Sequence, residues 1–213
     1  MKKNEPFVIT INRELGSGGR TVGEKLAQRI GVSFYDKAII RGLEEKYGLT
    51  AEEIEKLKGK KRSWWMDFQD FVTSAPYGGA NARLWLQAEK LNSKPTSGEL
   101  FHAESEILEA AAQAGSCVVT GRCGFFVFRN HPNHLSVLIK ATKDYRVDRV
   151  MKRQGLSRNE ALSLIARIDK MRENYVQNFT GLSRYDSRNY QLVLSMDEIT
   201  EDEAVDIILK FLK

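Results

Sequence analysis

A glycine-rich segment with one arginine and one hydroxyl offers the strongest chemistry in this sequence. It follows the apolar, β-branched run Phe7–Ile11 and precedes a helical pattern. Glycines let the backbone turn its N–H groups inward, and the first turn of a helix adds partial positive charge. A strand, a loop and a helix in this order predict a nest for the phosphates of a nucleotide. The expected nucleotide-binding residues are Gly16, Ser17, Gly18, Gly19, Arg20 and Thr21.

This segment agrees with the phosphate-loop pattern G-x-x-x-x-G-K-[ST] at two of its four fixed positions. Gly19 and Thr21 match the pattern. Arg20 replaces its lysine, and Glu14 stands where its first glycine should be. We expect Arg20 to lie near the β- and γ-phosphates, in a geometry that suits its planar fork, and Thr21 to bind Mg²⁺ through its hydroxyl. The alternative is a plain glycine turn between a strand and a helix.

Positive charge is concentrated in the C-terminal half of the chain. The net charge of the 213 residues is +5, and between residues 143 and 190 eleven Lys or Arg face six Asp or Glu. A local surplus of arginine favours a polyanionic ligand, either the phosphates of a nucleotide or a nucleic acid.

The arginines of this half are spaced so that they share helix faces. Arg146, Arg149 and Arg153 are separated by three and four residues, which places them on one face of a predicted helix. A second predicted helix carries further arginines, so a hairpin over residues 143–180 could close over a triphosphate as a lid. A solvated charged face is the alternative. The expected catalytic residues are Arg20, Arg149, Arg153, Arg167 and Arg172.

Four residues are expected to bind the second substrate. Arg122 follows a buried strand and a glycine, so its head should project over the edge of the sheet and bind the acceptor phosphate. Asp36 could bind a base or a ribose, or it could cap a helix that begins at residue 38. The substrate-binding set is Asp36, Arg41, Arg122 and Asp169.

Strand and helix patterns alternate along the chain, which predicts an α/β fold with a parallel sheet covered on both faces. Ligands of such sheets bind at the carboxyl ends of the strands, where the glycine loop and Arg122 fall. Strands are expected at 7–11, 32–35, 116–120, 134–140 and 190–194. Helices are expected at 21–30, 38–47, 51–58, 98–114, 144–154, 157–179 and 201–212.

Composition narrows the class of protein. No apolar run approaches the roughly 20 residues that a membrane helix needs, and the first residues lead into a strand without a secretory segment. Two cysteines, Cys117 and Cys123, fit a reducing compartment. We therefore expect a cytoplasmic protein without a membrane partner, with one domain over residues 1–213.

The segment 59–100 is the least readable part of the chain. It contains the adjacent tryptophans Trp64 and Trp65, with Phe68 and Phe71 close behind. These aromatic side chains could pack an inserted subdomain, form the contact of a homodimer or stack on a base. We interpret the segment as a candidate acceptor-binding insertion.

Four stretches together resemble the cytidylate kinase-like proteins, P-loop relatives of bacterial cytidylate kinase among the nucleoside monophosphate kinases. The likeness spans roughly residues 7–212, and the glycine loop and the Phe-Tyr-Asp-Lys block are its most specific parts. The four stretches are Ile9–Arg20, Phe34–Lys37, Val118–Cys123 and Tyr190–Leu194.

The resemblance implies a P-loop NTPase three-layer fold with a central parallel five-stranded sheet, a helical insertion and a helical arginine lid. It implies ATP with Mg²⁺ as donor and a nucleoside monophosphate as acceptor. The chain departs from true cytidylate kinases in Arg20, and in Thr120 and Cys123 where those enzymes carry aspartates around the Gly-Arg turn. CMP is therefore the first candidate acceptor, and another small phosphorylated or hydroxylated molecule stays open.

Three functions are compatible with the sequence. The leading one is an ATP-dependent kinase with small nucleotide substrates. The second is a nucleotide-binding sensor without turnover, which the altered loop motivates. The third is a nucleic-acid binder, which the basic C-terminal half and the tryptophan pair motivate, although the sequence has no helix-turn-helix, zinc-finger or RNA-stacking signature.

Overall fold

The computed structural model describes residues 1–2, 5–36 and 97–212. It divides the chain into two compact units, one made of Met1–Phe34 with Ala111–Lys213 and the other of Tyr35–Ala110. The described part of the second unit is residues 35–36 and most of helix α5 (Ser97–Gln113). The glycine loop and both arginine-bearing helices belong to the first unit.

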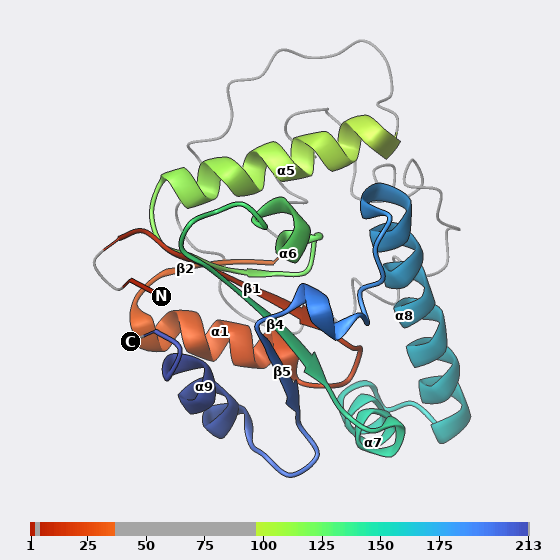
Figure 1. The fold of residues 1–213 in the computed structure, drawn as a ribbon. Coiled ribbons are helices and arrows are strands. Elements are labelled where there is room, and N and C mark those ends of the chain that lie inside the picture. The colour runs from red at the N-terminus through yellow and green to blue at the C-terminus, as the bar shows by residue number, and fades with distance from the viewer. Residues whose placement is uncertain (3–4, 37–96, 213) are drawn as a thin grey trace. The chain divides into compact units, whose positions relative to one another are not determined.

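A five-stranded sheet in the order β2-β3-β1-β4-β5 organises the fold (Figure 1). Strand β1 pairs in parallel with β3 and β4, and β4 pairs in parallel with β5. Register places Ile11 opposite Thr120 on one side and Val137 on the other, so the segments that follow these strands emerge at the same edge. The predicted parallel α/β sheet is confirmed. The strands are β1 (Val8–Arg13), β2 (Ser33–Tyr35), β3 (Cys117–Thr120), β4 (His134–Lys140) and β5 (Leu192–Ser195).

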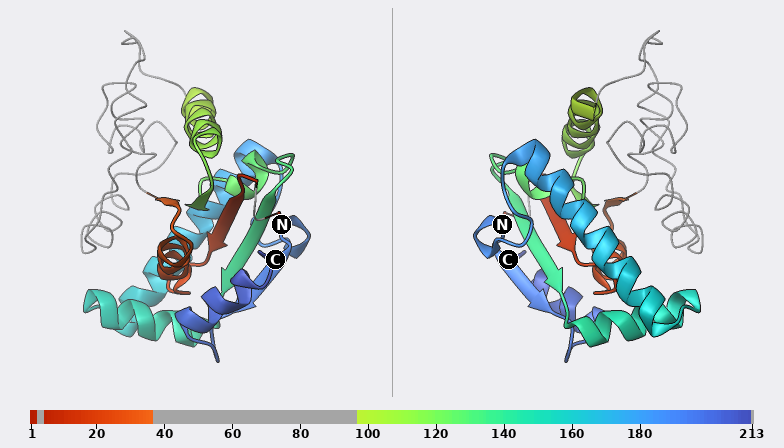
Figure 2. Two further views of the ribbon diagram at one scale, coloured as in Figure 1. Left: turned by 90° about the vertical axis from the view of Figure 1, so that its left-hand side faces the viewer. Right: turned by 90° about the vertical axis from the view of Figure 1, so that its right-hand side faces the viewer.

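One face of the sheet packs against helices α1 and α9. Ile9 and Ile11 of β1 are fully buried there, together with Leu26 of α1 and Ile208 of α9. Figure 2 shows these two helices on one side of the sheet and α8 on the other. The helices of the first unit are α1 (Gly19–Ile30), α6 (Gly124–Val127), α7 (Lys143–Gln154), α8 (Arg158–Thr180) and α9 (Glu201–Leu209), with the 3₁₀ helix η2 (Ser187–Asn189) before β5.

The alternate side chains of β1 point to the opposite face, as strand geometry requires. Thr10 lies there with its hydroxyl oxygen 2.8 Å from Nε2 of His134. A β-carbon added to Gly124 would lie 3.0 Å from the methyl group of Thr10, so α6 begins in close contact with the strand. Asn12 is the next side chain on this face. It therefore reaches the segment that follows α8.

The element boundaries differ in detail from the sequence-based prediction. Helix α1 begins at Gly19, two residues before the predicted start, so Arg20 lies in its first turn. Strand β5 begins at Leu192 and not at residue 190. The short helices α6 and η2 were not predicted, because three or four residues carry no periodic pattern. The predicted helices 38–47 and 51–58 lie outside the described residues, as does nearly all of the segment 59–100.

Strand β3 is buried along its whole length, as its unalternating apolar sequence predicts for a strand covered on both faces. Two helices of the first unit, α8 and α9, begin with a capping box. Ser157 and Glu160 form a capping box at the start of α8, and Thr200 and Glu203 form one at the start of α9. None of the helices within the described ranges is long and apolar enough to cross a membrane.

Candidate active site

The phosphate loop, residues 14–18, leaves β1 and enters α1 through two glycines in the left-handed region. Gly16 has φ 84° and Gly18 has φ 87°, values that side chains disfavour. Ser17 is fully buried, and its hydroxyl donates to the backbone oxygen of Glu14 over 2.9 Å. Gly18 is the N-cap of α1 and brings no side chain to the first N–H groups of the helix. An anion is the natural partner for a helix start of this kind.

Helix α7 packs directly on the phosphate loop. A β-carbon on Gly16 would lie 2.7 Å from the backbone oxygen of Arg146. The start of α7 is held in turn by Asp197, which accepts the backbone N–H of Thr142 over 2.8 Å. Hydrogen bonds from Ser195 and Thr142 lower the pKa of the Asp197 carboxyl to about 2. Asp197 therefore keeps its charge and fixes the helix that carries the arginines.

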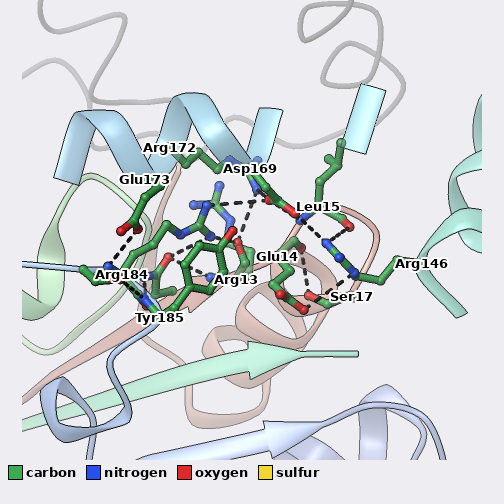
Figure 3. A network of polar contacts seen from close by, with 12 residues as sticks. Arg13, Glu14, Leu15, Ser17, Arg146, Asp169, Arg172, Glu173, Arg184 and Tyr185 are labelled. Atoms are coloured by element: carbon green, nitrogen blue, oxygen red, sulfur yellow. Dashed lines mark hydrogen bonds and ion pairs between the residues drawn. The ribbon is translucent and has the colours of Figure 1, made fainter. Parts of the chain in front are cut away.

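A first group of charges, here called the loop cluster, ties the phosphate loop to α7 and α8 (Figure 3). Asp169 of α8 accepts the backbone N–H of Leu15 over 3.0 Å. Its other oxygen lies 2.5 Å from Nη1 of Arg146 on α7. The Nε of Arg146 lies 3.6 Å from Oε2 of Glu14, which is ion-pair range. The loop cluster is Glu14, Arg146, Asp169, Arg172 and Arg184.

Two more arginines join this cluster from α8 and from the segment after it. Nη1 of Arg172 donates to the backbone oxygen of Arg13 over 3.3 Å, and Nη2 of Arg184 donates to the same oxygen. Arg184 is fully buried, and its Nη1 lies 3.6 Å from Oδ1 of Asp169. Within the described residues, Nε and Nη1 of Arg184 have no hydrogen-bond partner. Attraction to Asp169 and the hydrogen bonds of Nη2 together compensate the burial of this guanidinium.

A second group, here called the helix-start cluster, gathers over Gly18. A β-carbon on Gly18 would lie 3.5 Å from Cζ of Arg149 and 3.5 Å from Oε1 of Glu201. Arg149 and Glu201 form an ion pair of 2.6 Å. Burial lowers the pKa of Arg153, and the charges of Arg149 and Arg20 lower it further. The charges of Glu201 and Glu24 raise this pKa, so Arg153 senses charges of both signs near the start of α1. The helix-start cluster is Arg20, Arg149, Arg153 and Glu201.

The turn after β3 has an unusual backbone. Gly121, Arg122 and Cys123 follow one another in the left-handed region, with φ values of 75°, 54° and 53°. For a residue with a β-carbon this conformation costs roughly 1–2 kcal/mol. Strain of this kind is retained where the surrounding structure enforces it, often at functional sites. Arg122, expected to bind the acceptor, therefore lies on a strained backbone at the carboxyl end of β3.

The sequence of this chain carries a family signature that spans this site. The pattern of the cytidylate kinase-like family matches residues 8–198, which include the phosphate loop, both arginine-bearing helices and β5. The chain belongs to the cytidylate kinase-like family. Its membership confirms the resemblance that the glycine loop and the Gly-Arg turn indicated.

Individual proteins are also similar to this chain over nearly its whole length. A protein named cytidylate kinase from Methanopyrus kandleri is 25% identical over 210 residues, covering 94% of this chain and 90% of the relative. An uncharacterized protein from Eubacterium ventriosum has a similar structure, with a TM-score of 0.66, 24% identity and coverage of 97% and 98% of the two chains. Shikimate kinase from Bacteroides thetaiotaomicron has a TM-score of 0.51 and 14% identity, covering 97% and 98%. The fold is that of the P-loop kinases.

The remaining predicted site residues differ in exposure and in the unit to which they belong. Thr21 is partly exposed in the first turn of α1, and Arg167 is exposed on α8. Asp36 is buried and belongs to the second unit. Arg41 lies outside the described residues. Asp169, expected to bind substrate, is buried and bonds to the phosphate loop instead of facing solvent.

Sequence reasoning left three members of the loop cluster out of the predicted site residues. Arg146 was predicted only to share a helix face with Arg149 and Arg153. Glu14 was noted only as a departure from the loop pattern, yet its Oε2 accepts the backbone N–H of Ala141 over 3.1 Å and so joins β1 to the end of β4. The sequence signal that could have indicated this role is the carboxylate of Glu14 at a position where the phosphate-loop pattern has glycine. Arg184 lies in an irregular segment between α8 and η2, where no periodicity could have indicated its burial.

Proposed function

We propose that this protein transfers the γ-phosphoryl group of Mg-ATP to a nucleoside monophosphate, with CMP as the first candidate. Membership of the cytidylate kinase-like family and the P-loop kinase fold support the broader class, an ATP-dependent kinase of small molecules. One observation carries the proposal. The start of α1, which no side chain caps, follows the left-handed glycines Gly16 and Gly18 and lies close to the arginines of the helix-start cluster.

The donor phosphates fit this place for electrostatic reasons. Phosphoryl transfer needs positioning and positive charge around the moving group more than covalent help. The backbone N–H groups at Gly18 and Gly19 face the β-phosphate, and the guanidiniums of Arg20, Arg149 and Arg153 neutralise the tail. A polyphosphate brings negative charge to Arg153, whose pKa is lowered first by burial and then by the charges of Arg149 and Arg20.

The residues around the loop also fit a magnesium ion that arrives with the nucleotide. Thr21 offers a partly exposed hydroxyl in the first turn of α1. Within residues 1–2, 5–36 and 97–212, no group of three or more His, Cys, Asp or Glu is arranged to hold a metal. Mg²⁺ keeps several waters and is bound largely through substrate phosphates in many kinases. Bound there, the ion neutralises charge on the β- and γ-phosphates.

The acceptor phosphate is assigned to the turn after β3. Arg122 follows the carboxyl end of a strand that neighbours β1, so its backbone begins one strand away from the phosphate loop. Asp36 and Arg41 are proposed to bind the base or ribose of the acceptor. The segment 59–100 is proposed as the acceptor-binding insertion, and α7 with α8 as the arginine lid. A homodimer and a cytoplasmic location stay predictions.

An ADP-release assay across the nucleoside monophosphates tests the proposal. We expect steady turnover with Mg-ATP, fastest with CMP, and no measurable turnover in Arg20→Ala with an unchanged thermal midpoint. Lys152→Ala is the matched control, because Lys152 is an exposed cation on the arginine-bearing helix α7. Turnover with a sugar or another hydroxylated acceptor alone would move the assignment to a different kinase. Full activity in Arg20→Ala would remove the phosphate loop from the mechanism.

A nucleotide sensor without turnover is the second candidate function. It is favoured by the loop cluster, in which the carboxylate of Asp169 occupies a loop N–H group and pairs with Arg146. A loop held this firmly could bind a nucleotide without reorganising for transfer. Tight binding of Mg-ATP with no ADP release from any acceptor would select this function over the kinase.

A further inference from the structure

Arg13 is a charged residue beside the phosphate loop, and the functions assigned above give it no role. It is the last residue of β1, the central strand, so it lies at the edge where ligands of parallel sheets bind. Its side chain is partly exposed. The phosphate loop begins at the next residue, and the turn after β3 lies beside it.

Two glycines make room for this one side chain. A β-carbon on Gly19 would lie 2.6 Å from Cβ and 3.3 Å from Cγ of Arg13. A β-carbon on Gly121 would lie 2.0 Å from Nη1 and 3.2 Å from Cζ of Arg13. Real β-carbons do not approach heavy atoms so closely. The stem of Arg13 therefore lies on the first residue of α1, and its guanidinium lies on the glycine that precedes Arg122.

The backbone of Arg13 is fixed by the loop cluster. Its oxygen accepts hydrogen bonds from Arg172 and Arg184, and its N–H donates to the side-chain oxygen of Asn12 over 2.9 Å. The Gly121 N–H donates to the backbone oxygen of Ile11 over 2.9 Å, which holds the turn against the same strand. Both ends of the Arg13 side chain are thus placed by the sheet rather than by a loop.

We infer that Arg13 is a further catalytic residue, whose guanidinium contacts the phosphoryl group as it passes from ATP to the acceptor. The inference rests on the proposed kinase function. The proposed sites of the donor and acceptor phosphates are the first turn of α1 and Arg122. The stem of Arg13 lies on Gly19 at the first of these places, and its guanidinium lies on Gly121 beside the second.

The step is a direct displacement. An oxygen of the acceptor phosphate forms a bond to the γ-phosphorus, and the bond from the γ-phosphorus to the bridging oxygen breaks. The electron pair of that bond stays with ADP, and an ionised acceptor phosphate has no proton to release. Charge is spread over the three equatorial oxygens in the transition state. A planar guanidinium can bind two of them at once.

Two substitutions at Arg13 test this role. Arg13→Met keeps the stem on Gly19 and removes the charge, and we expect kcat to fall about 10²- to 10³-fold with the KM for ATP within about threefold. Arg13→Lys restores the charge but not the fork, so part of the lost kcat should return. Arg29→Met is the control, because Arg29 is exposed at the far end of α1 and pairs with Asp206.

A double-mutant cycle with Gly121→Ala separates this role from a structural one. The added methyl group displaces the head of Arg13, so Gly121→Ala alone should lower kcat at least tenfold. In the Arg13→Met background the same change should lower kcat by less than about threefold, because no guanidinium is left to displace. Independent effects on stability would multiply instead. If Arg13→Met does not fold, the Gly121→Ala and Arg13→Lys variants give the same comparison.

The outcomes distinguish this inference from the proposed function. An active wild type with kcat within threefold in Arg13→Met overturns the role of Arg13 and leaves the kinase standing. A wild type without turnover for any acceptor removes the kinase. The inferred role of Arg13, which rests on that function, is then overturned with it.

Discussion

The loop cluster and the helix-start cluster are built from the same residue type but differ in burial and in their carboxylates. Arg146 and Arg149 lie three residues apart on α7, yet each belongs to a different cluster. In the loop cluster the exposed fractions of the charged side chains run from 0% for Arg184 to 18% for Arg172. Arg149 and Glu201 are each 23% exposed, and Arg153 is exposed.

The carboxylates explain what each cluster does. Asp169 binds a backbone N–H of the phosphate loop and lies within ion-pair range of Arg146, Arg172 and Arg184, so its charge is used within the protein. Glu201 forms its ion pair with Arg149, and Arg153 senses the positive charges of Arg149 and Arg20 as well as the negative charges of Glu201 and Glu24. The first cluster holds the loop in shape. The second has positive charge that a nucleotide can neutralise.

Removing the central carboxylate of the loop cluster should have the largest effect. We expect Asp169→Ala to lower the free energy of unfolding by about 3–5 kcal/mol, because it removes the ion-pair partner of the buried Arg184 and one of the two carboxylates beside Arg146. Urea denaturation measures this change. Asp202→Ala, which breaks an exposed pair with Lys25, should cost less than about 1 kcal/mol. Equal losses in the two variants would contradict a structural role for the loop cluster.

Removing an arginine of the helix-start cluster should instead affect activity. Arg149→Ala is expected to lower kcat/KM for ATP about 10²-fold, equivalent to about 2.7 kcal/mol of binding to the transition state. Its free energy of unfolding should change by less than about 1 kcal/mol, because the broken pair is partly solvated. Steady-state kinetics and urea denaturation on the same sample give both values. If Arg149→Ala lost stability but kept its kinetic constants, the helix-start cluster would have a structural role, and the assignment would be contradicted.

The contact of α7 with the phosphate loop can be tested with a matched pair of glycines. Gly16→Ala and Gly155→Ala both place a side chain in the left-handed region, at a cost of roughly 1–2 kcal/mol. Only Gly16→Ala also brings a β-carbon to 2.7 Å from the Arg146 oxygen, whereas Gly155 has nothing within 4 Å. We expect Gly16→Ala to be less stable than Gly155→Ala by a further 1 kcal/mol or so. Equal thermal midpoints of the two variants would show that α7 can shift away from the phosphate loop without loss of stability.

The smallest expected effect concerns Asp197, which holds the helix that both clusters share. Its pKa lies near 2 in the folded protein and at the ordinary 3.8 in an unfolded chain. The Asp197 carboxylate therefore contributes stability above about pH 4, and this contribution is lost as the pH falls toward 2. The difference in thermal midpoint between the wild type and Asp197→Ala should shrink from pH 6 to pH 3. A difference that stays constant over this range would leave Asp197 without a role.

Local patterns predicted the parts of this site that depend on neighbouring residues. The glycines of the phosphate loop and the spacing of Arg149 and Arg153 on α7 could be read directly, because turn chemistry and helix periodicity act over a few residues. The parallel sheet followed from the alternation of strands and helices. All of these elements are present, with shifts of one or two residues at most of their ends.

Contacts between distant parts of the chain could not be predicted in the same way. Asp169 binds a backbone N–H 154 residues earlier, so its burial depends on how α8 packs and not on its neighbours in sequence. The sequence predicted Asp169 as a substrate-binding residue, and the structure adds its hydrogen bond to the phosphate loop. The space that Gly121 leaves for Arg13 is likewise visible only once β1 and β3 are paired.

The most direct test of the central claim is the backbone amide spectrum of the full chain during titration with Mg-ATP. We expect the largest chemical-shift changes at residues 16–21, saturating together with changes at the Arg149 and Arg153 side chains. The Leu15 amide, already bound by Asp169, should change little. Saturable binding that leaves residues 16–21 unchanged would contradict the account, because the donor phosphates would then lie elsewhere.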